Sequence, residues 1–125
     1  MREIKFRGMG FNEWLYGSLL YVDENVCICN TPIGLNFKMF KVDKNSVGQY
    51  TGLKDKNGKE IYEGDLLKFD SNYCSEEKLA YNLIGNIVFN YDKYIIETKK
   101  YAYDLNEIKN REFEIVGNVY ENDEY

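Results

Sequence analysis

The pair Asn57-Gly58 constrains the fold of this chain more than any other feature of its sequence. Asparagine and glycine tolerate a positive φ, and here they lie between two β-prone arms, so the pair predicts the tip of a tight hairpin. Two forms of the hairpin remain open. One is a two-residue loop, and the other is a type I turn that starts at Asp55 and leaves Gly58 as a left-handed bulge residue.

A second bend is predicted at Gly64-Asp65, because glycine lets the chain turn sharply and aspartate caps the turn. The bend precedes a short apolar strand at residues 66–69, an arrangement that small β-barrels use. Turn chemistry alone nevertheless favours an ordinary surface hairpin over a barrel.

Alternation of apolar and polar residues predicts β-strands along most of the chain. The predicted strands, besides the two arms of the hairpin, are residues 3–6, 14–21, 26–29, 37–42, 66–69, 84–89, 94–98 and 113–120. Gly8-Met9-Gly10 breaks the first of these, and Asn12-Glu13 predicts the turn that follows. Gly17 lies inside a strand and therefore predicts a bulge or a close backbone approach.

Helical signals are few. Asp104 and Glu107 have capping-box spacing, which predicts one short helix at residues 104–109. Residues 70–83 are predicted to be a loop or one helical turn capped by Ser75. The elements together predict a mainly β fold of antiparallel sheets, with a small barrel-like C-terminal part and one short helix.

A length of 125 residues fits a single domain, residues 1–125, that buries about two thirds of the surface of the unfolded chain. The alternative is a division into sub-lobes 1–45 and 46–125. No apolar run approaches the ~20 residues of a membrane span, and the first residues do not form a signal-peptide core. We therefore expect a cytoplasmic protein with no membrane partner, which the odd number of cysteines also favours.

The absence of histidine narrows the chemistry, because it excludes Ser-His and Cys-His nucleophiles and an imidazole base. Cys27 and Cys29 are expected to be buried apolar residues, since the paired Cys-x-x-Cys spacing of structural zinc sites is absent. Glu60, Glu63 and Asp65 leave carboxylate chemistry open. Charged residues beside a turn are more often hydrogen-bond acceptors, so we expect no catalysis, no metal and no cofactor.

The aromatic and charged residues of the sequence bear on what the protein could bind. Twelve tyrosines and seven phenylalanines suit half-buried sheets and protein interfaces. The net charge of −5 argues against a general affinity for nucleic acid. It leaves room for a local basic groove, because Lys54, Lys56 and Lys59 surround the predicted hairpin tip.

Residues 47–65, which read VGQYTGLKDKNGKEIYEGD, resemble the signature of the YopX family, small proteins encoded mainly by phages and prophages of low-GC bacteria. Residues 1–7, 14–17 and 113–122 also resemble the pattern of that family, in the same order. The resemblance covers nearly the whole chain except residues 22–42 and 70–83. It implies a mostly β, oligomeric fold and brings no catalytic mechanism with it.

The leading interpretation is a non-catalytic, phage-derived β module that forms homo-oligomers and binds a host or phage protein. The candidate binding residues are Gln49, Tyr50, Lys54, Lys56, Lys59 and Tyr62. One alternative is a small barrel that binds nucleic acid through the hairpin lysines and neighbouring aromatic residues. Another is an inhibitor that presents the acidic residues 112–125 to a host nucleic-acid enzyme, and the weakest is a carboxylate hydrolase.

Overall fold

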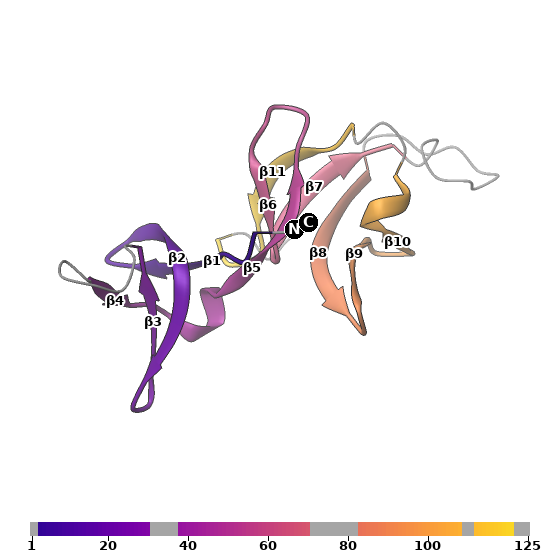
Figure 1. Ribbon diagram of the computed structural model, residues 1–125. Coiled ribbons are helices and arrows are strands. Elements are labelled where there is room, and N and C mark those ends of the chain that lie inside the picture. The colour runs from indigo at the N-terminus through magenta and orange to yellow at the C-terminus, as the bar shows by residue number, and fades with distance from the viewer. Residues whose placement is uncertain (1–2, 31–37, 71–82, 109–111, 122–125) are drawn as a thin grey trace. The chain divides into compact units, whose positions relative to one another are not determined.

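The computed structural model describes residues 3–30, 38–70, 83–108 and 112–121, and these residues form mainly antiparallel β-strands (Figure 1). The predicted mainly β class is therefore confirmed. The chain divides into two compact units, Met1–Gly52 (unit 1) and Leu53–Tyr125 (unit 2). This division lies a few residues after the boundary of the sub-lobes considered above.

Unit 1 is a curled antiparallel sheet. Its strands are β1 (Phe6–Gly10), β2 (Glu13–Val22), β3 (Asn25–Cys29), β4 (Met39–Lys41) and the first part of β5 (Gly48–Lys54). They follow the order β4-β3-β2-β1-β5, and β6 (Glu60–Tyr62) comes next to β5 in the sheet. A 3-10 helix that the sequence did not predict, η1 (Lys44–Ser46), connects β4 to β5.

The chain just after β4 holds the curl of unit 1 together. The Val42 amide donates to the Val26 carbonyl at 3.0 Å, and the Asp43 amide donates to the Met9 carbonyl at 2.9 Å. Because β3 and β1 lie on opposite sides of β2, this segment bridges the two strands that flank β2. Val42 is 5% exposed and belongs to the core of the unit.

Close packing against Val42 also explains why β1 runs from Phe6 to Gly10, whereas the sequence predicted a strand at residues 3–6 broken by Gly8-Met9-Gly10. A Cβ at Gly8 would lie 2.8 Å from Cγ2 of Val42. A Cβ at Gly10 would lie 2.7 Å from the Lys41 carbonyl oxygen. The two glycines are therefore strand residues that admit a neighbouring segment, and they do not end the strand.

Among the described residues, three hairpins have two-residue turns with a non-glycine residue at positive φ. Phe11 and Asn12 have φ of 55° and 64°, Asp23 has 57° and Tyr91 has 61°. The first of these turns corrects the predicted turn at Asn12-Glu13, since Glu13 already pairs with Gly10 in the sheet. A left-handed conformation costs most L-residues about 1–2 kcal/mol, and aspartate and asparagine tolerate it best.

Unit 2 contains a five-stranded antiparallel sheet in the order β10-β9-β8-β7-β11. Its strands are β7 (Asp65–Phe69), β8 (Leu83–Asn90), β9 (Lys93–Glu97), β10 (Ala102–Asp104) and β11 (Glu114–Asn118). Within the described residues the sheet is open, with β10 and β11 at its two edges. The predicted short helix is present as a 3-10 turn, η3 (Leu105–Glu107), in which the Asp104 carboxylate accepts from the Asn106 amide at 2.9 Å.

One face of this sheet forms the core of unit 2. Leu67, Ile87 and Ile96 are each fully buried on it, and the 3-10 turn and the approach to β11 cover it with Leu105, Ile108 and Phe113. The register explains the pattern, because Ile87 lies opposite Ile96 and Leu67 lies opposite Ile115. Burial of apolar side chains on one face is the main stabilisation available to such a sheet.

Several predicted features lie outside the described residues: the first residue of the strand 37–42, the turn capped by Ser75, and the end of the helix 104–109. In the part of the chain that is described, no helix has the length and hydropathy needed to cross a bilayer.

Gly17 tests the close packing of unit 1. A Cβ at this position would overlap the backbone carbonyl of Cys29, which agrees with the predicted close backbone approach. We expect Gly17→Ala to lower the free energy of unfolding by about 1–3 kcal/mol, because the backbone of β3 must move. Urea unfolding followed by circular dichroism would measure the loss.

Gly58→Ala is the matched control, since a Cβ there meets no atom within 4 Å and only the positive φ of 83° opposes it. We expect this change to cost about 1 kcal/mol. If the two variants lost the same free energy of unfolding, the contact with Cys29 would not be what restricts position 17 to glycine.

Candidate functional site

The hairpin between β5 and β6 is organised by the buried carboxylate of Asp55. Its Oδ1 accepts hydrogen bonds from the amides of Asn57 and Lys59, each at 2.9 Å. The Gly58 amide donates to the Asp55 carbonyl at 3.0 Å, and Gly58 has a φ of 83°. These contacts select the second of the two predicted forms, a type I turn followed by a left-handed bulge glycine.

The other oxygen of Asp55 joins this hairpin to the C-terminal strand. Oδ2 accepts from the Ile115 amide at 3.1 Å, and the Lys56 amide donates to the Phe113 carbonyl at 3.0 Å. The Glu114 carboxylate lies 3.9 Å from Nζ of Lys56 and 3.8 Å from Nζ of Lys68. The turn is thus connected to β11 by backbone, carboxylate and ion-pair contacts.

A second buried carboxylate closes the bend at Gly64-Asp65. Gly64 has a φ of 91°, and Oδ2 of Asp65 accepts from the Tyr62 amide at 2.8 Å. The Gly64 amide donates to the Ile87 carbonyl, and the Gly64 carbonyl accepts from the Val119 amide, both at 2.8 Å. The predicted bend is present, and it brings the β6–β7 connection against β8 and the end of β11.

The carboxylates that left acid–base chemistry open have structural partners. Asp65 is 1% exposed and holds the Tyr62 amide, while Oε1 of Glu60 accepts from the Tyr62 hydroxyl at 3.0 Å. In the ranges that the structure describes, no three cysteine or acidic side chains gather where they could hold a metal ion. Cys27 and Cys29 are both buried in β3, as expected for apolar core residues.

The candidate binding residues fall into both units. In unit 1, Gln49 is half-buried opposite Phe6, and Tyr50 is 6% exposed, with its ring centroid 5.4 Å from Nζ of Lys5. In unit 2, the predicted lysines come together on one hairpin and are all exposed, namely Lys54, Lys56 and Lys59. Tyr62 of the same unit is 1% exposed, so the structure places its ring in the interior.

Comparison with known proteins decides the family. A model of the YopX protein family matches residues 5–125. The chain belongs to the YopX family. The crystal structure of protein EF1440 from Enterococcus faecalis is similar to this YopX chain, with 25% sequence identity over 99% of this chain and 98% of that chain and a TM-score of 0.58. No curated protein matches the sequence.

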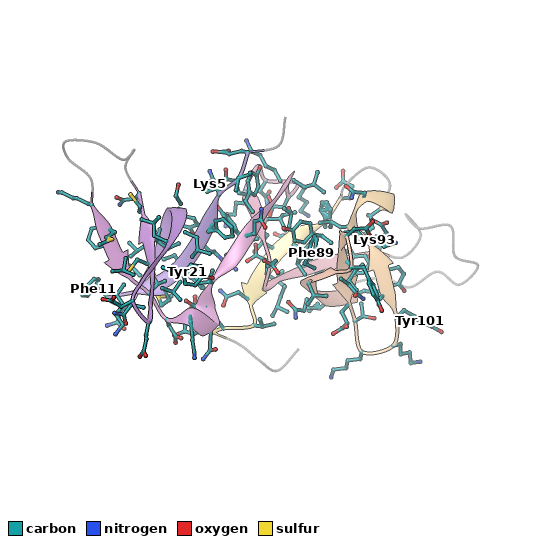
Figure 2. The ribbon with its side chains drawn as sticks, turned by 60° about the horizontal axis from the view of Figure 1, so that its bottom comes forward. Lys5, Phe11, Tyr21, Phe89, Lys93 and Tyr101 are labelled. Atoms are coloured by element: carbon teal, nitrogen blue, oxygen red, sulfur yellow. The ribbon has the colours of Figure 1, made fainter. Side chains whose placement is uncertain are left out.

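Three strongly exposed aromatic residues were not among the binding residues predicted from the sequence. Phe11 is 79% exposed, Tyr21 is 72% exposed and Tyr91 is 93% exposed. Figure 2 shows Phe11 at the margin of unit 1. Two of them, Phe11 and Tyr91, take the first position of a two-residue turn. Glycine or asparagine is usual at that position, so an aromatic residue there is itself a signal in the sequence.

Removal of the Asp55 carboxylate should show how far unit 2 depends on it. We expect Asp55→Ala to lower the free energy of unfolding by about 3 kcal/mol, because three backbone amides lose their acceptor and two of them belong to the turn. Asp55→Asn, which keeps one acceptor oxygen, should lose about half as much. Chemical unfolding followed by circular dichroism would measure the free energy of unfolding of both variants.

The matched control is Asp43→Ala. Asp43 is an exposed cap whose carboxylate accepts from the Asn45 amide at 3.0 Å. The loss there should be about 1 kcal/mol. A loss at Asp55 no greater than that at Asp43 would contradict the role given to the buried carboxylate.

Proposed function

We propose that this chain is a non-catalytic, phage-derived binding module that associates with itself and acts in the host cytoplasm by binding a host or phage protein. The observation that carries the proposal is the exposure of large aromatic side chains in both units, led by Tyr91 at 93% and Phe11 at 79%. Aromatic residues concentrate at protein interfaces, because they offer a large apolar area at a low entropic cost. Covering such a surface with a partner lowers the free energy, because apolar area is removed from water.

The interior supports a role without catalysis. The buried carboxylates of Asp55 and Asp65 accept hydrogen bonds from backbone amides, which fixes the turns that contain them. Glu60 accepts from the Tyr62 hydroxyl. The chain has no histidine, the side chain that most often transfers protons near neutral pH.

Sheet edges support self-association. β10 lies at one edge of the five-stranded sheet and β4 at one edge of the six-stranded sheet. Edge strands carry backbone groups that can pair with another chain, and proteins cover them in assemblies or protect them with charge. Exposed lysines next to β10, namely Lys99 and Lys100, protect that edge in part.

The nucleic-acid alternative gains less support. Lys54, Lys56 and Lys59 do share an exposed hairpin, but the nearest signature tyrosine in unit 2, Tyr62, is buried and offers no stacking surface. Lys56 also forms an ion pair with Glu114, which reduces the positive charge that the hairpin offers to a phosphate.

The inhibitor alternative depends on the acidic residues 112–125. The same ion pair neutralises part of the negative charge of that region.

Sedimentation equilibrium at micromolar concentrations should give a mass greater than that of one chain. The expected mass falls toward that of the monomer on dilution, as for any reversible assembly. A single monomeric species throughout this range would remove self-association from the proposal and leave only the binding of another protein.

A gel-shift titration at low salt with single- and double-stranded DNA and RNA should give no retarded band. The double variant Lys54→Ala/Lys59→Ala is the control, because it removes two exposed cations from the hairpin. A shift that weakens with salt and disappears in this variant would favour the nucleic-acid function.

A further inference from the structure

The hairpin formed by β8 and β9 extends beyond the strands on either side of it. The pairing of β7 with β8 ends at Leu66 opposite Asn86, and the pairing of β9 with β10 ends at Ile95 opposite Asp104. The hairpin continues for two further pairs, the last of them Asn90 with Lys93. In Figure 1 its orange tip projects past the neighbouring strands of unit 2.

Tyr91 occupies the first turn position of this tip with a φ of 61° and an exposed fraction of 93%. The turn does not need a tyrosine. Asp23 takes the corresponding left-handed position between β2 and β3, at a φ of 57°, and aspartate is among the residues that tolerate this conformation. A bulky residue held in an unfavourable conformation with its ring in solvent points to a role for the ring itself.

Apolar surface continues from the core to this tip. Phe89 and Tyr94 are opposite each other, with ring centroids 5.0 Å apart in an edge-to-face arrangement. Tyr94 belongs to the buried core, whereas Phe89 is 49% exposed. The exposed side of Phe89 therefore offers a rigid aromatic surface to a ring such as Tyr91 of another molecule.

Opposite charges stand side by side at the tip. Asp92 is exposed, and the Lys93 side chain is 52% exposed, with its Nζ 3.4 Å from the Asp104 carboxylate. Figure 2 shows Phe89 and Lys93 in the same region of unit 2. A lysine ammonium has three donors, so Lys93 can keep Asp104 and still bind a second carboxylate. A patch with adjacent opposite charges is complementary to its own copy about a two-fold axis.

We propose that residues 89–93, the β8–β9 tip, form the contact between two copies of this chain, related by a two-fold axis. The inference rests on the proposed self-association and names its surface. Tyr91 of each copy packs against Phe89 of the other, and Asp92 of each copy pairs with Lys93 of the other. The contact occurs twice by symmetry, which is why one short hairpin serves both copies.

Charge exchange tests this arrangement by sedimentation equilibrium. Asp92→Lys places lysine against lysine at both contacts, and Lys93→Glu places acid against acid, so each variant alone should associate at least about tenfold more weakly than the wild type. An equimolar mixture of the two variants pairs lysine with acid at both contacts and should recover the association. Failure of the mixture to recover it, or wild-type association of either variant alone, would overturn the two-fold contact.

Tyr91→Gly separates the contact from folding. Glycine relieves the left-handed strain, so the thermal midpoint of the dilute monomer should rise, while self-association should weaken by about tenfold or more. Asp23→Gly is the matched control: it places glycine at the corresponding left-handed turn position between β2 and β3 and should leave self-association unchanged. Wild-type affinity in Tyr91→Gly would sink the inference.

The outcomes also separate this inference from the function on which it rests. A wild-type protein that stays monomeric at all concentrations overturns the β8–β9 contact together with the proposed self-association, and leaves the binding of another protein standing. A wild-type protein that associates while the tip variants associate equally well overturns the β8–β9 contact alone and assigns self-association to another surface.

Discussion

Three backbone amides converge on the buried carboxylate of Asp55, and the arrangement of unit 2 depends on them. A buried carboxylate is costly unless its oxygens are hydrogen-bonded, and here both oxygens have donors. Two donors come from the turn itself, and the third comes from Ile115, 60 residues further along the chain. One side chain therefore fixes the geometry of a local turn and the position of the C-terminal strand beside it.

Unit 1 joins strands that are distant in its sheet through backbone hydrogen bonds and not through a buried carboxylate. The segment at Val42 bridges β3 and β1 through backbone hydrogen bonds, and the glycines at positions 8 and 10 leave room for it. Gly17 likewise admits the backbone of Cys29. Close approach of backbone segments, made possible by missing side chains, gives this unit its curl.

The division between interior and exterior shapes the functional proposal. Carboxylates and tyrosines of the family signature are largely engaged in fixing turns, as Asp65 and Tyr62 illustrate. Other aromatic residues project from hairpin tips, where Tyr91 even retains an unfavourable backbone conformation. The signature side chains named here therefore stabilise the fold, whereas the exposed aromatic rings are the ones on which the binding proposal rests.

Local features were determined by the sequence itself: the bends at Gly58 and Gly64, the cap at Asp104 and the grouping of the hairpin lysines follow from nearby residues alone. The tertiary structure alone decided that Gly8 lies inside a strand, because the reason is its contact with Val42, which is distant in the chain. It also decided which tyrosines are buried. Tyr62 and Tyr91 have the same chemistry, and only the packing of the sheet places one inside and the other in solvent.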